Sequence, residues 1–489
     1  MPLPFIVSLI FDGLPSWMPD PWRIAKVGGT LGALAITKRY MSGAETLAER
    51  DMHGRVVIIT GGTSGIGAVT AFEMAKRGAQ VVLLTRQSPS DPYISDFIGD
   101  MRERAGNDLI YAEQVDLSSL HSIRKFATRW IDNAPPRRLD MIILCAATMT
   151  PPGGTRTENE EGIESAWMVN YLANFHLLGI LSPAIRAQPF DRDVRIILAT
   201  CSSYIGSPPL DAPLDKKDWS PRKAYARSKL ALMVFGQAYQ KHLDSYKRPD
   251  QLPMNARIFM VDPGFARTPG MRLWLSRGSI WGLLVYIVMY AFAWLFLKNE
   301  SMAAQSVLHA VLDESLIRGE GGKLIKECMV VDCARKDVKD EDVAKKLWES
   351  SDSLIEHIEK EQAVVRAKAK KDQGKRDLEA KKEQEKRDQE AKNAQQVEEI
   401  ESLLGAIKKG KQKEAQKAKD GRKSKNGGEN GTASDTHNSS HCHPVFFTEK
   451  LRRLPPSFGT ASAQQANPVA HGYAYQDAQR SNGGKGARL

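Results

Sequence analysis

Short apolar runs rich in β-branched residues alternate with segments of helical periodicity along the first two thirds of the chain. Such runs are typical of strands buried on both faces, and strands that alternate with helices form a parallel sheet. The runs that we interpret as strands are Val56–Ile59, Val81–Leu84, Leu109–Val115, Met141–Leu144, Val194–Ala199 and Ala256–Val261, with a seventh within Lys323–Val331.

The segments between these runs have the spacing of amphipathic helices. Right-handed crossovers between parallel strands then place helices on both faces of the sheet. The pattern predicts an α/β fold, a doubly wound parallel sheet of the Rossmann type, with an apolar lid insertion and a charged C-terminal tail that is either disordered or helical. The predicted helices are Ala68–Lys76, Leu117–Trp130, Asn159–Ala187, Lys223–Leu243 and Met302–Leu312.

Composition divides the 489 residues into four parts. Beyond Glu356 the chain is rich in Lys, Glu, Arg, Gln and Ala, and beyond Gly421 it is rich in small and polar residues, so neither part can bury a core. We predict an apolar, membrane-associating segment at 1–50 and a catalytic domain at 51–358 with its lid at 278–298. A charged helical or disordered segment at 359–425 and a disordered tail at 426–489 complete the chain.

The net charge of +11 is concentrated after the predicted catalytic domain, in Arg366–Lys382 and Lys408–Lys425. Such segments attract nucleic acid or an anionic membrane surface. Acidic residues are interleaved from Asp372 to Glu401, which favours a solvated charged helix, so we predict no specific nucleic-acid partner.

The five cysteines include no C-x-x-C pair, which argues against a disulfide framework or a zinc site. His437, His441, Cys442 and His443 cluster in a low-complexity segment, and we interpret this cluster as compositional. The sequence therefore predicts no metal site.

The turn after the first strand, Thr60–Gly67, reads T-G-G-T-S-G-I-G. Between a strand and a helix, such glycines permit a tight turn and a close approach of backbone to phosphate, and the helix N-terminus attracts the pyrophosphate. The alternative is a glycine-rich turn with no ligand. The residues that we expect to bind a dinucleotide here are Gly61, Thr63, Ser64, Gly65, Ile66 and Gly67.

Tyr225 and Lys229 are one helical turn apart and share a helix face. A lysine ammonium beside a phenol favours the phenolate, so we expect Lys229 to lower the pKa of Tyr225 and make it a usable acid and base. Alone, such a pair is weak evidence of a site, because it also occurs by chance on helix surfaces.

Together, T-G-x-x-x-G-x-G and Tyr-x-x-x-Lys resemble the short-chain dehydrogenase/reductase family over roughly Gly54–Trp348. The chain looks most like the retinol-dehydrogenase-like branch and like fungal short-chain reductases of lipid droplets and vacuoles. The resemblance implies that Tyr225 and Lys229 are catalytic together with Ser203, which sits three residues before a glycine as Ser202 does not. It also implies that Asn170 distorts its helix and holds a water linked to Lys229.

The resemblance further implies a cofactor and its contacts. Asp116, whose alternative role is a helix N-cap, would contact the adenine, and Ala146 would lie beside the cofactor. Pro263, Gly264 and Thr268 would close on the nicotinamide. Arg86 stands where an acidic residue would bind the ribose of NAD, which favours NADP(H). The family's N-N-A-G is replaced here by Cys145–Thr148, which puts cofactor affinity in doubt.

Two apolar segments indicate membrane contact. Ile280–Leu297 is uncharged and long enough to span a bilayer, but a crossing there would separate two parts of one sheet. We therefore expect a monotopic lid in one leaflet, with a buried substrate lid as the alternative. Near the N-terminus, Phe5–Phe11, Ile24–Ile36 and the interfacial Trp17 and Trp22 suggest a second contact, with a short helix packed on the domain as the alternative.

These features predict a membrane-associated NADP-dependent oxidoreductase that reduces a lipophilic carbonyl, or oxidises the alcohol, and that could form a homodimer. We expect it at the cytoplasmic face of an internal membrane, namely the endoplasmic reticulum, a lipid droplet or a vacuole. A reductase of the 3-ketosphinganine or steroid type is a variant of this hypothesis. The non-enzymatic alternative is a catalytically weak, cofactor-binding membrane protein that shapes lipid droplets or vacuoles.

Overall fold

The structure, a computed structural model, describes residues 21–133, 137–211, 214, 217–317 and 319–421. The strands of these residues form one sheet in the order β3-β2-β1-β4-β5-β6-β7-β8. Strands β3 to β7 pair in parallel and β8 pairs antiparallel with β7, which confirms the predicted doubly wound sheet. The strands are β1 Val56–Thr60, β2 Gln80–Thr85, β3 Ile110–Gln114, β4 Met141–Leu144, β5 Val194–Ala199, β6 Ala256–Asp262, β7 Lys323–Lys326 and β8 Met329–Val331.

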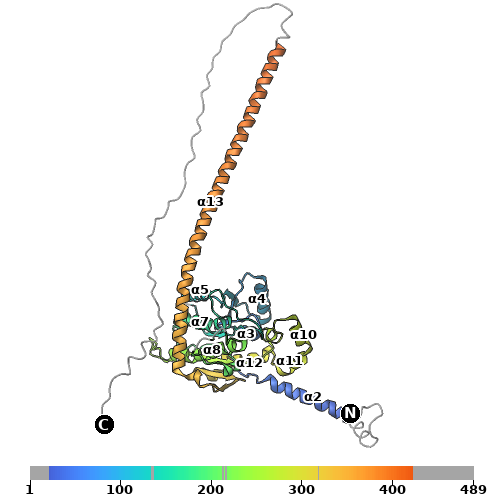
Figure 1. The fold of residues 1–489 in the computed structure, drawn as a ribbon, viewed down its shortest axis with the longest axis vertical. Helices are drawn as coiled ribbons and strands as arrows, with labels where there is room; N and C mark the ends of the chain where they lie inside the picture. The colour runs from blue at the N-terminus through green and yellow to red at the C-terminus, as the bar shows by residue number, and fades with distance from the viewer. Residues whose placement is uncertain (1–20, 134–136, 212–213, 215–216, 318, 422–489) are drawn as a thin grey trace, which may run out of the picture. The chain divides into compact units, whose positions relative to one another are not determined.

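Helices cover both faces of this sheet (Figure 1). The helices of the described residues are α2 Pro21–Ser42, α3 Gly65–Lys76, α4 Pro92–Ala105, α5 Leu120–Ile131, α6 Ser165–Trp167, α7 Ala173–Arg186, α8 Pro221–Asp244, α9 Pro269–Leu275, α10 Ile280–Val288, α11 Tyr290–Phe296, α12 Glu300–Leu312 and α13 Glu341–Gly421. Short helical turns are η1 Met168–Leu172, η2 Ser202–Gly206, η3 Glu314–Leu316 and η4 Lys336–Lys339.

Two apolar cores explain why the strands read as unbroken apolar runs. Val57 and Ile59 of β1 pack into one core with side chains of α3, α4 and α12. Ile58, between them, packs into the other core with side chains of α5, α7 and α8. Because successive side chains of a strand point to opposite faces, both faces of β1 are covered.

The predicted seventh strand is in fact two strands. Strands β7 and β8 form a hairpin in which Lys326 pairs with Met329. Glu327 and Cys328 make the turn with φ of 51° and 56°, a left-handed conformation that is uncommon for residues other than glycine. Since these two residues are not a usual turn pair, the turn had no clear signal in the sequence.

Helix α4 was not among the predicted helices. Asp91 caps it by accepting a hydrogen bond from the backbone N–H of Tyr93 at 3.0 Å, and Pro92 is its first residue. An N-cap aspartate followed by proline is a regular helix start, so the signal was present.

The charged helix α13 begins before the predicted end of the catalytic domain. The described residues up to Ala363 form one compact unit, and those from Val364 to Gly421 form another. Within the first unit, Trp348 and Ile358 of α13 are buried in the core that contains α7 and α8. The predicted domain boundaries remain predictions, and the tail at 426–489 lies outside the described residues.

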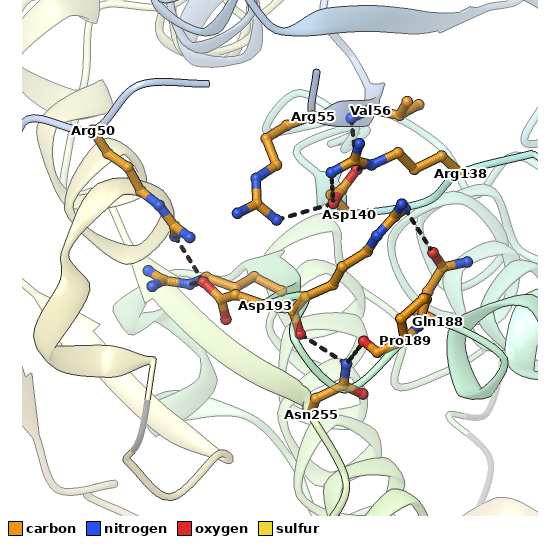
Figure 2. Close-up of polar contacts among 11 residues, drawn as sticks. Arg50, Arg55, Val56, Arg138, Asp140, Gln188, Pro189, Asp193 and Asn255 are labelled. Atoms are coloured by element: carbon orange, nitrogen blue, oxygen red, sulfur yellow. Dashed lines mark hydrogen bonds and ion pairs between the residues drawn. The ribbon is translucent and has the colours of Figure 1, made fainter. Parts of the chain in front are cut away.

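Buried polar contacts lie at the amino ends of β1, β4 and β5, opposite the edge where the site lies (Figure 2). Asp140, which precedes β4, is fully buried and accepts hydrogen bonds from the backbone N–H of Val56 at 2.9 Å and from Arg138 at 2.8 Å. Asp193, which precedes β5, accepts from Arg50 at 2.7 Å. These pairs satisfy buried charges and hold the strand ends in register.

The apolar lid folds into two short helices rather than one long helix. Helix α10 has 9 residues and α11 has 7, and they are separated at Met289. Within the described residues, one helical stretch, 165–186, is long and apolar enough to cross a membrane, and 72% of its apolar 18-residue window is buried inside the fold. It comprises α6, η1 and α7, whose side chains belong to the core.

Candidate active site

The carboxyl ends of five parallel strands meet at one edge of the sheet, where ligands of such sheets bind. Gly61 follows β1, Arg86 follows β2 and Ala146 lies just beyond β4. Ser203 and Pro263 lie just beyond β5 and β6. The fold therefore brings predicted site residues from five separate segments to the same edge.

The turn after β1 requires glycine at two positions. Gly61 has a φ of 68°, and a Cβ added there would lie 2.9 Å from the backbone nitrogen of Ala146. A Cβ on Gly67 would collide with the carbonyl oxygen of Gly61. The backbone N–H of Ala146 donates to the Thr60 hydroxyl at 3.2 Å, which fixes the end of β4 against this turn.

Helix α3 begins inside the glycine turn at Gly65. Its N-cap residue, Ser64, has extended backbone and its hydroxyl makes no capping hydrogen bond. Thr63 and Ile66 flank this start and are partly exposed. The first N–H groups of a helix lack intrahelical partners, and the helix dipole is positive there, so this end of α3 suits an anionic group such as phosphate.

The segment after β6 reaches the glycine turn. Gly264 has a φ of 79°, and its N–H donates to the Asp262 carboxylate at 2.9 Å. Thr268 caps the start of α9. A Cβ added at Gly65 would lie 3.3 Å from the Thr268 side chain. The predicted cofactor segments 61–67 and 263–268 therefore lie close together.

Tyr225 and Lys229 lie one turn apart near the start of α8. The Lys229 ammonium is 5.7 Å from the centroid of the Tyr225 ring and donates to the carbonyl oxygen of Ala199 at 2.9 Å. Lys229 is only 3% exposed, so its charge acts with little screening by water.

The expectation that Lys229 lowers the pKa of Tyr225 is wrong for this structure. Burial raises the pKa of Tyr225 well above 10.0, and neighbouring Cys201 and Asp262 raise it further. Burial also lowers the pKa of Lys229. Desolvation of the phenolate therefore decides the direction of this pKa, and the Lys229 ammonium donates to the Ala199 carbonyl instead of the Tyr225 hydroxyl. At neutral pH the Tyr225 hydroxyl keeps its proton.

The two adjacent serines have different surroundings. The Ser203 hydroxyl lies 2.8 Å from the Cys201 thiol, and that thiol donates to the Tyr225 hydroxyl at 3.7 Å. The Ser202 hydroxyl instead donates to the Asp262 carboxylate. Ser203 is therefore the serine that shares a cluster with Tyr225.

Cys201 was not among the predicted site residues. Its backbone is extended, with φ of −165° and ψ of 161°, directly before η2. Its contacts depend on how η2 lies against α8, so no local pattern in the sequence indicated it.

Asn170 lies in η1, a π-helical turn between α6 and α7. Its side-chain amide donates to the Thr148 carbonyl and to the Ser228 hydroxyl, each at 3.0 Å, and its oxygen accepts from the Thr148 N–H at 2.7 Å. π-Helical turns interrupt α-helices and are frequent at functional sites. The buried Asn170 thus holds the segment Cys145–Thr148 through backbone contacts.

Arg86 and Asp116, which follow β2 and β3, make fewer side-chain contacts within the site. The Arg86 side chain is exposed just beyond β2. The Asp116 carboxylate accepts from the backbone N–H and hydroxyl of Ser118, at 2.8 Å and 2.6 Å. Ser119 is the N-cap of α5, so Asp116 closes a turn before the helix instead of capping it.

In the part of the chain that the structure describes, no group of three or more His, Cys, Asp or Glu side chains is placed to hold a metal ion. The histidine and cysteine cluster at 437–443 lies outside that part.

Comparison with known proteins assigns the chain to a family. Residues 55–274 match the family described as short chain dehydrogenase. The uncharacterized oxidoreductase pbr1 of Schizosaccharomyces pombe is 41% identical, over 74% of this chain and 97% of that protein. Retinol dehydrogenase 13 of Mus musculus is 30% identical, over 68% of this chain and 93% of that protein. Polyprenol dehydrogenase of Mus musculus is 31% identical, over 60% of this chain and 82% of that protein. The chain therefore belongs to the short-chain dehydrogenase family and is an oxidoreductase.

Proposed function

We propose that this oxidoreductase uses NADP(H) to reduce a lipophilic carbonyl, or to oxidise the corresponding alcohol, at a membrane surface. The observation that carries the proposal is the cluster of Tyr225, Ser203 and Lys229 beside the glycine turn. One edge of the sheet therefore carries the groups that would bind the cofactor phosphates, donate the proton and orient the substrate oxygen.

The glycine turn fits a dinucleotide. No Cβ fits at Gly61 or Gly67, so only glycine backbone can occupy these two positions, and the start of α3 presents N–H groups to a phosphate. Arg86 would bind the 2′-phosphate of NADP(H), and Asp116 would lie near the adenine. When bound, NADP(H) supplies or accepts the hydride.

The protein's own residues would handle the substrate oxygen and its proton. In reduction, Tyr225 would donate a proton to the oxygen, and its raised pKa means that the hydroxyl still carries this proton at neutral pH. Ser203 donates a hydrogen bond that orients the same oxygen. Lys229 keeps a positive charge beside Tyr225 as the phenolate develops, and Asn170 maintains the helix geometry around the pair.

Arg86 allows a test of cofactor preference. We expect Arg86→Asp to weaken NADPH binding about tenfold or more, because it replaces a charge-assisted hydrogen bond with repulsion of the 2′-phosphate. NADH binding should improve, since a carboxylate can accept hydrogen bonds from ribose hydroxyls. Titration of both cofactors measures the change. Arg104→Asp, at an exposed position of α4, is the control, and an unchanged preference in Arg86→Asp would reject Arg86 as the selector.

The lid lies next to the cofactor segment. The backbone N–H of Lys298, at the end of the lid, donates to the carbonyl of Phe265 at 2.9 Å, and the N–H of Arg267 donates to the carbonyl of Lys298 at 2.9 Å. The Arg267 guanidinium also donates to the Tyr290 hydroxyl of α11 at 2.8 Å. A substrate dissolved in a membrane could therefore reach the site from beneath this lid.

Two arguments support a lipophilic substrate and a membrane surface. The lid and α2 expose many large apolar side chains, a condition that soluble proteins avoid unless the surface binds something apolar. Two relatives are named for retinol and polyprenol, both lipophilic alcohols. We further propose that the enzyme acts at the cytoplasmic face of the endoplasmic reticulum, a lipid droplet or a vacuole, and that it could form a homodimer.

Turnover by the full-length enzyme on phospholipid vesicles tests the function. NADPH oxidation is followed with retinal, a polyprenal, a long-chain fatty aldehyde and, as the control, water-soluble propanal. We expect at least one lipophilic aldehyde to be reduced faster than propanal. Preference for propanal would contradict the lipophilic substrate. Tight NADPH binding with no turnover of any aldehyde or of the matching alcohols with NADP⁺ would favour the non-enzymatic alternative.

A further inference from the structure

Cys201 contacts both hydroxyls that the proposed reaction uses. Its thiol lies 2.8 Å from the Ser203 hydroxyl and donates to the Tyr225 hydroxyl at 3.7 Å. Among the described residues, these are the side-chain hydrogen bonds of the Ser203 and Tyr225 hydroxyls. The thiol therefore forms the link between two hydroxyls that come from different elements, η2 and α8.

Neighbouring polar groups are engaged elsewhere. The Ser202 hydroxyl donates to the Asp262 carboxylate and accepts from the Lys326 ammonium at 3.1 Å. The Lys229 ammonium donates to the Ala199 carbonyl at 2.9 Å. Neither group is therefore in a position to align the Ser203 and Tyr225 hydroxyls.

We infer that Cys201 is a positioning residue of this site, whose thiol aligns the Ser203 and Tyr225 hydroxyls toward one substrate oxygen. The inference rests on the proposed function. Both hydroxyls must point at the same oxygen in the transition state, and a small error in that geometry is costly to the rate. A thiol is suited to the task because it is large enough to touch both groups, while its weak hydrogen bonds yield readily to a substrate.

This role distinguishes three substitutions at Cys201. Alanine removes the link and leaves both hydroxyls free to turn. Valine keeps roughly the volume of the side chain but cannot form hydrogen bonds. Serine keeps a donor and acceptor, with shorter reach, so it restores part of the link. A residue that merely fills space would instead be replaced best by valine.

The experiment measures kcat, KM for the aldehyde and Kd for NADPH in the full-length enzyme and in Cys201→Ala, Cys201→Val and Cys201→Ser. We expect kcat to fall about tenfold in the alanine and valine variants, which corresponds to the loss of roughly one hydrogen bond. The serine variant should recover part of this loss. The Kd for NADPH and the melting temperature should stay unchanged. Cys333→Ala, a substitution of a half-buried cysteine outside the site, is the control and should leave kcat unchanged.

Two results would overturn the inference. Unchanged kcat in Cys201→Ala would show that the hydroxyls align without the thiol, and wild-type kcat in Cys201→Val with a loss in Cys201→Ser would show that the side chain only fills space. These outcomes require an active wild-type enzyme, so a failure of the inference is distinct from a failure of the proposed function, in which the wild type itself turns over no carbonyl or alcohol.

Discussion

Replacing Tyr225 with phenylalanine is expected to lower kcat by about a hundredfold or more while NADPH still binds. A positioned acid or base typically contributes a factor of roughly 10² to 10⁴ to the rate. Phenylalanine keeps the ring, and with it the packing against Lys229, but removes the proton. The glycine turn and the start of α3, which would hold the cofactor phosphates, are unaffected. Steady-state rates with a lipophilic aldehyde and NADPH titration measure the two effects separately.

The raised pKa of Tyr225 also predicts how the reduction rate depends on pH. A phenol with a pKa above 10.0 is protonated throughout the neutral range, so loss of the Tyr225 proton should lower the reduction rate only in alkaline solution. Tyr93→Phe, at an exposed position of α4, is the matched control and should behave as the wild type. Near-normal turnover in Tyr225→Phe would show that the proton comes from another group.

The regular part of the fold was predictable from local pattern. The buried strands β1, β2, β4, β5 and β6 coincide with apolar runs because a doubly covered sheet needs such residues on both faces. The hairpin turn at Glu327 and Cys328 was not predictable, since its left-handed residues are stabilised by their surroundings. The break between α10 and α11 at Met289 was not predictable either, because no proline or glycine marks it in the sequence.

Which residues form the candidate site was easier to predict from the sequence than the pKa shifts of those residues. Motif spacing located Tyr225, Lys229 and Ser203, because α8 and the end of β5 converge at one edge of the sheet. The direction of the Tyr225 pKa could not be read from an i, i+4 pair, since it depends on burial and on neighbours from other strands. Cys201 was missed for the same reason: its role is visible only once η2 and α8 are placed together.

We propose that the exposed apolar side chains of the lid and α2 form a single membrane contact. The Lys38 ammonium of α2 donates to the carbonyls of Trp294 and Leu297, at 2.6 Å and 3.2 Å, and lies 5.2 Å from the centroid of the Trp294 ring. In Figure 1, α10 and α11 lie beside each other, and α11 contacts α2. Ile280 and Val288 of α10 are 86% and 76% exposed.

Neither lid helix can cross a bilayer. At 1.5 Å per residue, α10 and α11 are about 14 Å and about 11 Å long, whereas the hydrocarbon core is about 30 Å thick. Their exposed faces are instead suited to lie in the interface, where each fully buried aliphatic or aromatic side chain contributes roughly 1.5–3 kcal/mol.

Serine substitutions in the lid test this contact. Replacing the five exposed apolar residues Ile280, Val285, Ile287, Val288 and Phe292 with serine should remove several kcal/mol of membrane affinity and release most of the protein to the soluble fraction on membrane flotation. Release should be only partial to the extent that α2 also binds. The matched control replaces five equally exposed apolar residues of α13, namely Val364, Val365, Leu378, Val397 and Ile400. Release by the control set alone would assign the membrane contact to α13.

Protease protection on sealed membranes tests the monotopic topology independently of affinity. Tags are placed near Gln87, before the lid, and at the C-terminus, after it. Because β6 and β7 pair in parallel across the lid insertion, the chain before and after the lid must share one compartment. Both tags should therefore be digested from the cytoplasmic side. Digestion of one tag with protection of the other would mean that the lid crosses the membrane, which a single intact sheet does not allow.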